Sequence, residues 1–218
     1  FWHTHEYETA ARDLEQLQKL LPIEASLLSR TQQHQAVASD LYRGGVIYHQ
    51  HAAINPAKWV FGLHRAAADH GALIQGDTNV LGLQKSRHGY MVKTTRGPVK
   101  ANKVLLATNG YTPPQMSALR RRVLPVPSFI ISTEELGRDR IRQLFPSNMM
   151  VVESRARHCY FRPSPDKTRI VFGARAAMFD APEALVVSQL RKLLSQVFPQ
   201  LQQVQISHSW RGLYGICI

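Results

Sequence analysis

The 218-residue sequence has little cysteine and no long apolar run, and each absence excludes a class of protein. Its two cysteines, Cys159 and Cys217, form no CxxC pair, which argues against a disulfide scaffold and a cysteine-rich zinc site. No stretch approaches the roughly 18 consecutive apolar residues that a membrane-spanning helix needs. The sequence therefore predicts a cytoplasmic protein with no membrane span.

Targeting and catalytic motifs are also missing. The first ten residues, FWHTHEYETA, contain neither a basic flank nor an apolar segment, so we expect no secretory signal there. Because the sequence does not begin with Met, we expect a piece of a longer protein. None of the patterns GxSxG, HExxH, GxxxxGK[ST] or GxGxxG occurs, so these residues contain no glycine-rich loop for a phosphate group.

Acidic residues are scarce relative to basic ones, with 15 Asp+Glu against 27 Lys+Arg and a net charge of +12. A nucleic acid or an anionic ligand would explain this excess. However, the basic residues are scattered, and the one tight cluster, Arg120-Arg121-Arg122, lacks the interleaved aromatics that stack on bases. A solvated basic face is the simpler interpretation. We predict no nucleic-acid partner and keep a basic nucleic-acid-binding module as an alternative function.

Two His-x-His pairs are the only candidates for a metal site, His3 with His5 and His49 with His51. On a strand, each pair would present both imidazoles on one face, as some zinc sites require. Neither pair has a third histidine or a carboxylate placed to complete the ligand set. We therefore predict no metal.

Apolar periodicity predicts two helices in the first part of the chain, over residues 6–21 and 30–38, followed by a strand at 46–48. Asn55-Pro56 then starts another helix, because Asn is a favoured N-cap and Pro has no amide proton to leave unpaired. Gly71 supplies the left-handed end of that helix. Its apolar residues share one face, so we expect the helix to be buried in the core; they include Trp59, Val60 and Leu63.

A strand at residues 72–74 would complete a strand–helix–strand unit, and a β-meander over 78–84, 90–95 and 99–101 would follow it. The meander leads to KVLLATNGYT at residues 103–112. Its apolar run predicts a strand buried on both faces at 104–106, and ATNG predicts a tight turn at the strand's carboxyl end. In α/β sheets ligands lie at that end. An ordinary core strand followed by a loop is the alternative.

Beyond residue 112 the pattern predicts an antiparallel sheet with helices on one face. Pro125 and Pro127 favour an edge position for a long strand at 124–133. Further elements are a helix at 138–145, strands at 149–153, 158–163 and 169–175, a helix capped by Asp180 that stops before Pro199, and a strand at 203–209. The predicted fold class is therefore α/β, changing to α+β in the second half.

Three segments stand in a telling order: GGVIYHQHAAINPAKWVFGLHRAAADHGALIQGDTNVLGLQ, RGPVKANKVLLATNGYT and RRVLPVPSFIISTEEL. This order resembles the FAD-dependent amine and amino-acid oxidoreductases of the glycine/sarcosine oxidase and D-amino-acid oxidase superfamily. Within it, four features resemble the gamma-glutamylputrescine oxidoreductases: VASDLYRGGVIYHQ, the INP at the helix start, FPQLQQVQI and the W-x-G at residues 210–212. The resemblance covers nearly the whole chain.

The resemblance implies four domains. Residues 1–44 would be a helical lead-in and 45–116 a partial Rossmann-like FAD-binding domain with its β-meander. Residues 117–209 would form a substrate-binding antiparallel sheet flanked by helices, and 210–218 would begin the return to the FAD domain. The family's GxGxxG strand–helix and its C-terminal flavin-closing segment are absent. We therefore expect a central fragment that alone binds FAD poorly or not at all.

The resemblance also implies roles for individual residues. Tyr160 and Arg162 alternate with Cys159 and Phe161, so they would face the flavin together and bind substrate. The cofactor-binding positions implied are Thr78, Val80, Ala107, Thr108, Asn109, Gly110, Trp210 and Gly212.

The histidines and the two sheet residues have competing interpretations. His49 and His51 are further substrate-binding candidates, since they lie near the family's approach to the flavin ring. The family usually has small residues there, so His51 can instead be a departure from it. Tyr160 can instead be a packed aromatic, and Arg162 a surface cation.

The activity implied is oxidation of a C–N bond of a small amine or amino acid, resembling gamma-glutamylputrescine, by hydride transfer to FAD. The resulting imine would then be hydrolysed. Arg162 would suit a substrate carboxylate through bidentate pairing. Another amine, a D-amino acid or an N-methyl amino acid is the alternative substrate within the superfamily. The catalytic residues are not among those that the resemblance identifies in this sequence.

Overall fold

The computed structural model describes residues 1–156, 158–175 and 181–217. Contacts divide the chain into two compact units. Unit 1 comprises residues 1–53 and 127–212, and unit 2 comprises residues 54–126 and 213–218. The mixture of helices and antiparallel sheets agrees with the predicted fold class. Asp180, expected to cap a helix, lies outside the described residues.

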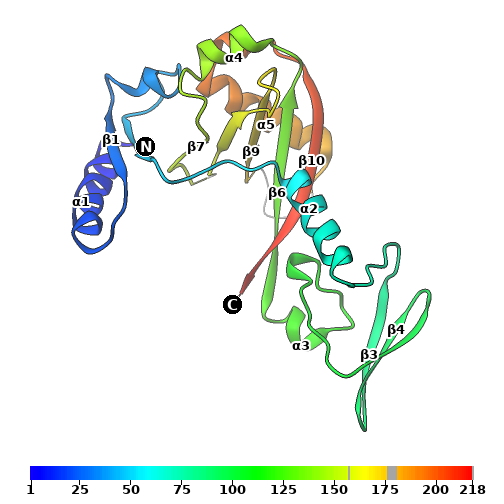
Figure 1. Cartoon of the computed structure of the whole chain (residues 1–218). Helices are drawn as coiled ribbons and strands as arrows, with labels where there is room; N and C mark the ends of the chain where they lie inside the picture. Colours follow the sequence, from blue (N-terminus) through cyan, green and yellow to red (C-terminus); the bar gives the residue numbers. More distant parts are fainter. Residues whose placement is uncertain (157, 176–180, 218) are drawn as a thin grey trace. The chain divides into compact units, whose positions relative to one another are not determined.

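A five-stranded sheet forms the centre of unit 1, in the order β10-β6-β9-β8-β7 (Figure 1). Its strands are β6 (Val123–Thr133), β7 (Val151–Val152), β8 (Tyr160–Pro163), β9 (Ile170–Ala174) and β10 (Ile206–Cys217). Strand β6 begins, and β10 ends, within unit 2. The pairs β6–β9, β9–β8 and β8–β7 are antiparallel.

The core of unit 1 lies between this sheet and the helices α4 (Arg138–Leu144) and α5 (Glu183–Val197), which cover one face (Figure 1). The rings of Phe161 and Phe172 stack at 5.5 Å, and Phe198 contacts Phe161 edge-on at 5.8 Å. Along β8, Phe161 is buried whereas Tyr160 and Arg162 are only half-buried. The predicted alternation is confirmed, and it places Tyr160 and Arg162 on the face opposite the helices.

Residues 1–53 of unit 1 form α1 (Thr4–Leu20) and an antiparallel pair of strands, β1 (Ala25–Ser29) and β2 (Gly44–Tyr48). Gly44 has a φ of 137°, and a Cβ there would lie 2.7 Å from a ring carbon of Tyr7, so only glycine lets α1 approach β2. The helix predicted at 30–38 is wrong. The structure has only the 3₁₀ turn η1 (Gln33–Gln35), because Ser29 and Gln32 bond to each other and close a local turn instead.

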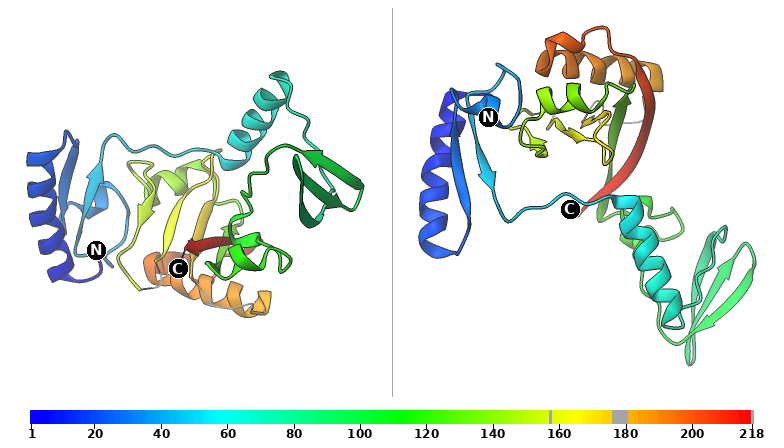
Figure 2. Two further views of the ribbon diagram at one scale, coloured as in Figure 1. Left: turned by 90° about the horizontal axis from the view of Figure 1, so that it is seen from below. Right: turned by 45° about the horizontal axis from the view of Figure 1, so that its top comes forward.

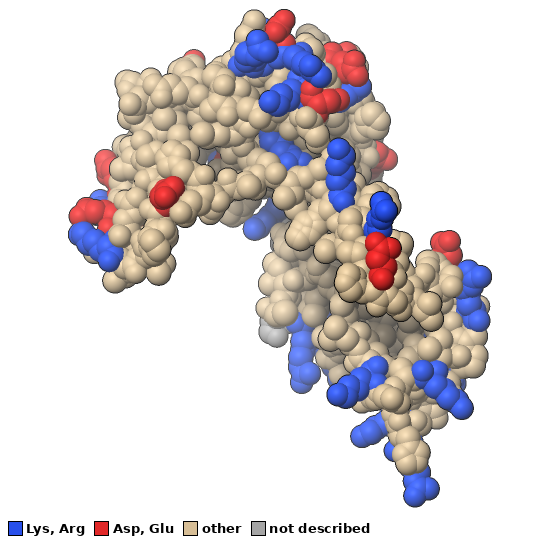
Figure 3. Space-filling view, in the orientation of Figure 1, with Lys and Arg blue, Asp and Glu red and all other residues tan. Residues whose placement is uncertain are grey.

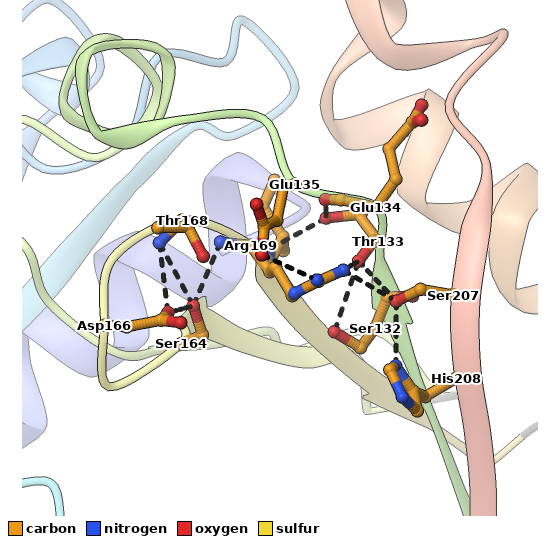
Figure 4. Close-up of polar contacts among 11 residues, drawn as sticks. Ser132, Thr133, Glu134, Glu135, Ser164, Asp166, Thr168, Arg169, Ser207 and His208 are labelled. Atoms are coloured by element: carbon orange, nitrogen blue, oxygen red, sulfur yellow. Dashed lines mark hydrogen bonds and ion pairs between the residues drawn. The ribbon is translucent and has the colours of Figure 1, made fainter.

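A polar network fixes one end of the five-stranded sheet (Figure 4). The Arg169 guanidinium donates to the Thr133 carbonyl and to Ser207 Oγ, both at 3.1 Å, and pairs with Glu135 at 2.9 Å. It thereby connects β9, β6 and β10. The edge position predicted for β6 is wrong, since β10 and β9 flank it. On the β9 side neither proline is a paired residue, because the register of β6 with β9 covers residues 129–132.

Unit 2 contains α2 (Pro56–Asp69), the turn η2 (Asn109–Tyr111), the short helix α3 (Ser117–Arg120) and a three-stranded sheet, drawn in two further views in Figure 2. The sheet is the predicted meander of β3 (Val80–Ser86), β4 (Gly89–Thr94) and β5 (Gly97–Ala101). The predicted ends of α2 are confirmed: the Lys58 amide donates to Asn55 Oδ1 at 3.2 Å, and Gly71 has a φ of 86°.

Burial in unit 2 differs from the prediction. Helix α2 contains no buried residue, and Trp59, expected in the core, is 44% exposed. Residues 72–74 and 104–106 form no strands, and Leu73 and Leu105 are fully or almost fully exposed. A buried strand needs hydrogen-bonded neighbours on both sides, and the described residues supply none for either segment.

The described residues include no helix with the combined length and apolar content that crossing a bilayer requires.

Candidate functional site

The second face of the five-stranded sheet carries the predicted substrate-binding residues Tyr160 and Arg162. Tyr160 is paired in register with Gly173 of β9, and its ring lies directly over that glycine. The Tyr160 hydroxyl reaches across β9 to Ser128 Oγ of β6 at 2.5 Å. A Cβ at Gly173 would lie 2.7 Å from Tyr160 Oη and nearer still to two ring carbons. The tyrosine can therefore lie flat across the sheet only because position 173 is glycine.

Local sequence explains this arrangement. Phe161 and Phe172 are register partners on the core face, and a one-residue slip would turn both toward the second face. Their burial therefore fixes Tyr160 over Gly173. Ser128 and Gly173 were not predicted as site residues. A glycine inside an otherwise apolar strand was the one available signal, because it often marks a close approach by another group.

The two histidine candidates contact a different part of unit 1. His49 Nε2 lies 2.9 Å from Ser26 Oγ, and the His51 ring stacks on Tyr48 at 4.7 Å. Both histidines are exposed, and these contacts are with the two-stranded sheet rather than with β8. Among the described residues no three His, Cys, Asp or Glu side chains gather as a metal site would require. Substrate binding by His49 and His51 stays a prediction.

In unit 2 the predicted ATNG turn is held against the last residues of β10. Asn109, with a left-handed φ of 48°, accepts hydrogen bonds at Oδ1 from the Gly215 amide at 2.5 Å and the Gly110 amide at 2.8 Å. The Leu213 amide donates to Tyr111 Oη at 2.9 Å. A Cβ at Gly110 would lie 2.9 Å from the backbone of the neighbouring β10 segment. The turn and residues 213–215 therefore form one local structure.

This turn fits a flat cofactor of the kind that the resemblance implies. Ala107 is exposed, the turn residues Ala107, Thr108 and Gly110 are small, and residues 103–108 belong to no sheet, so unpaired backbone adjoins small side chains. Backbone without bulky side chains lets an aromatic ring system approach closely. Of the other implied positions, Trp210 and Gly212 lie on β10, immediately before the segment that holds the turn. Thr78 and Val80 lie at the start of the meander, where Thr78 Oγ1 donates to the Gly76 carbonyl at 2.8 Å.

A second polar cluster in unit 1 is buried. The guanidinium of Arg155 pairs with both oxygens of Glu153, and Tyr42 donates to Glu153 at 2.5 Å. Burial, reinforced by the Glu153 charge, raises the pKa of Tyr42 far above its ordinary value. Burial alone would lower the pKa of Arg155, but the hydrogen bond to Glu153 raises it. A cavity of about 590 Å³ adjoins the cluster and includes Trp2, whose ring lies 4.6 Å beneath Arg155. These charges neutralise each other, which indicates a structural role.

Comparison with known proteins identifies the family. Residues 1–217 match the family model described as FAD dependent oxidoreductase. The chain belongs to this family. The predicted family, fold and FAD cofactor are thereby confirmed, and FAD is the cofactor of the family to which the chain belongs.

Individual curated relatives are also oxidoreductases. A probable oxidoreductase, OrdL, of Haemophilus influenzae is 32% identical over 85% of this chain and 43% of its own length. The gamma-glutamylputrescine oxidoreductase of Escherichia coli is 32% identical over 81% of this chain and 41% of its own length. The chain thus spans less than half the length of these curated relatives.

Solved structures show the same fold. Glycine oxidase from Geobacillus kaustophilus superposes with a TM-score of 0.81 at 19% identity, covering 99% of this chain and 57% of that one. L-proline dehydrogenase from P. horikoshii gives 0.77 at 18% identity, covering 98% of this chain and 58% of that one.

Proposed function

We propose that the whole protein oxidises a C–N bond of a small amine or amino acid resembling gamma-glutamylputrescine, and that this chain supplies its substrate-facing sheet. The observation that carries the proposal is the placement of Tyr160 and Arg162 together on the face of the sheet opposite its helices. The 32% identity to an enzyme named for gamma-glutamylputrescine supports the substrate class. A cytoplasmic location is part of this proposal.

In this function bound FAD would supply the acceptor for the hydride that leaves the carbon next to the amine. The chain's own residues bind the substrate and orient it. Arg162 pairs with a substrate carboxylate and the Tyr160 hydroxyl donates a hydrogen bond to it. The residues that would hold the cofactor are Ala107, Thr108, Asn109 and Gly110 of the turn, together with Trp210 and Gly212. The backbone at Thr78 and Val80 would bind its adenine.

A substrate panel tests the proposal in the FAD-loaded enzyme that contains this chain. Under anaerobic conditions, gamma-glutamylputrescine should bleach the flavin absorbance fastest, ahead of putrescine, glycine, sarcosine and a D-amino acid. Putrescine is the matched control because it has the amine without the carboxylate. Faster bleaching by sarcosine or a D-amino acid would move the substrate elsewhere in the superfamily. No bleaching by any amine would contradict the function itself.

A nucleic-acid-binding module is the second candidate, and one observation favours it. Unit 2 holds 11 of the 27 Lys+Arg but only 2 of the 15 Asp+Glu, and Lys and Arg project around its meander in Figure 3. An anionic cofactor explains the same excess, because a basic surface attracts any polyanion. Fluorescence anisotropy with labelled single-stranded and duplex DNA should show no binding at about 150 mM salt. A steeply salt-dependent affinity there would favour the alternative.

A further inference from the structure

We propose that Ser128 is a positioning residue that holds the Tyr160 hydroxyl as a hydrogen-bond donor to a substrate carboxylate. The Ser128–Tyr160 contact requires glycine at position 173, where the tyrosine ring crosses the intervening strand. The inference rests on the proposed function and deepens it. Ser128 would act through Tyr160, without contacting the reacting atoms itself.

The first argument is geometric. Ser128 lies on β6 and Tyr160 on β8, so the whole of β9 separates their backbones. Their hydroxyl oxygens are nevertheless 2.5 Å apart, because the tyrosine ring crosses β9 at the one residue without a side chain. The pairing of β6 with β9 and of β9 with β8 already holds these strands in register. The Ser128–Tyr160 hydrogen bond is therefore not required to align the strands. Its contribution is to the orientation of the Tyr160 hydroxyl.

The second argument concerns the direction of the hydrogen bond. Either oxygen can be the donor. When an anion approaches the Tyr160 proton, Ser128 turns to donate to Tyr160 Oη, and the chain runs from Ser128 through Tyr160 to the anion. Such chains polarise each hydroxyl and strengthen the outer hydrogen bond. Without Ser128, the phenol loses the hydroxyl that lies 2.5 Å from its oxygen.

The third argument identifies the ligand class. Arg162 lies two residues along β8 on the same face, so its Cα is about 7 Å from that of Tyr160. A guanidinium and an oriented hydroxyl donor on one face suit a carboxylate, which accepts at two oxygens. They discriminate against a neutral amide of the same shape, which accepts at one. The pair would therefore select substrates that carry a carboxylate.

The test is equilibrium binding of propionate, which has no amine to oxidise, to the FAD-loaded enzyme that contains this chain, measured by isothermal titration calorimetry. Propionamide is the neutral control ligand. The variants are Ser128→Ala, Ser128→Thr, Tyr160→Phe, Gly173→Ala and the double variant S128A/Y160F. Gly82→Ala is the matched glycine control, since a Cβ on this strand residue of β3 meets nothing within 4 Å. Thermal melting verifies that each variant is folded.

We expect Ser128→Ala to weaken propionate binding about two- to tenfold and Tyr160→Phe to weaken it about tenfold or more. Ser128→Thr should restore binding to within about twofold of the original enzyme. S128A/Y160F should equal Tyr160→Phe, because Ser128 acts only through the phenol. Gly173→Ala should behave like Tyr160→Phe, and Gly82→Ala should have no effect. Propionamide affinity should stay within about twofold throughout.

The inference would be overturned if Ser128→Ala left propionate affinity unchanged. It would also be overturned if Ser128→Ala weakened propionate binding as much in the Tyr160→Phe background as in the original enzyme. If Gly173→Ala fails to fold, the Ser128 and Tyr160 variants still decide the matter. Failure of the proposed function is separate. An enzyme that oxidises no amine yet shows these affinity changes would refute the function alone, and an active enzyme without them would refute only the role of Ser128.

Discussion

Unit 1 and unit 2 are built from equally clear sequence signals but differ in what they bury. In unit 1, α5 buries five residues and the sheet packs phenylalanine rings against it. In unit 2, α2 has a proline start, an asparagine cap and a left-handed glycine end, yet none of its residues is buried. Val126 is the one buried hydrophobic side chain in the described part of unit 2.

The difference teaches which sequence signals depend on context. Caps and left-handed glycines act within a few residues of the backbone, so they fix the ends of α2 without any core. An apolar face gains its roughly 25 cal/mol per Å² only when another element covers it. Charge follows the same division, because unit 2 has far fewer acidic residues to balance its basic ones. Stability of this chain should therefore reside mainly in unit 1.

The largest expected effect comes from the unit 1 core. Phe172→Ala should lower the free energy of unfolding of unit 1 by about 3–5 kcal/mol, because it opens a cavity beneath the stacked Phe161 ring. Phe61→Ala in α2, where the ring is 73% exposed, is the matched control and should cost less than about 0.5 kcal/mol. Urea titrations would follow unit 1 by the fluorescence of Trp2 and Trp210 in a Trp59→Phe background, and unit 2 by that of Trp59 in a Trp2→Phe/Trp210→Phe background. Equal losses for the two variants would contradict the comparison.

A smaller effect should appear at high pH. Because the pKa of Tyr42 is raised in the folded protein, its stabilising contribution is present below the unfolded pKa of about 10 and is lost as pH rises. The free energy of unfolding should fall by up to about 1.4 kcal/mol per pH unit above pH 10 on this account. Tyr42→Phe should be less stable at neutral pH, since Glu153 loses a donor, but should lack this part of the slope. Urea titrations from pH 8 to 11 would measure it, and identical slopes would show the prediction to be wrong.

The smallest effects belong to α2, where no packing hides them. Gly62→Ala should stabilise the helix by about 0.5–1 kcal/mol, because a Cβ there meets nothing within 4 Å. Asn55→Ala should destabilise it by about 1 kcal/mol through loss of the cap. Hydrogen exchange by mass spectrometry should show slower exchange in α2 for the first variant and faster exchange for the second. The amides of α5 serve as the internal control, and a change there would contradict the independence of the two units.

Much of the fold was predictable because its signals are local. The ends of α2, the meander of β3 to β5 and the alternation of β8 follow from residues that are close to each other in the sequence. The strands expected at 72–74 and 104–106 did not form, because an apolar run specifies a strand only when neighbours pair with it. The interior position of β6 was missed for a related reason. Prolines restrict only the residues that must donate, and the register that leaves Pro125 and Pro127 outside the β6–β9 pairing is a tertiary property.

The candidate site divides in the same way. Tyr160 and Arg162 were predictable from the period of a strand. Ser128 was not, because its contact with Tyr160 crosses an intervening strand and depends on the register of three strands at once. The ATNG turn was predicted from its small residues, whereas its attachment to the end of β10 joins residues more than 100 positions apart.

Gly173 has a consequence for anyone who interprets natural variation in this gene. Every missense change at that codon adds a Cβ, and the Tyr160 ring already occupies the space that the Cβ would need. Scoring by chemical similarity would class Gly173→Ala as mild, as it would Gly82→Ala on another strand. The two should separate in selection experiments, with position 82 tolerant and position 173 restricted to a single amino acid.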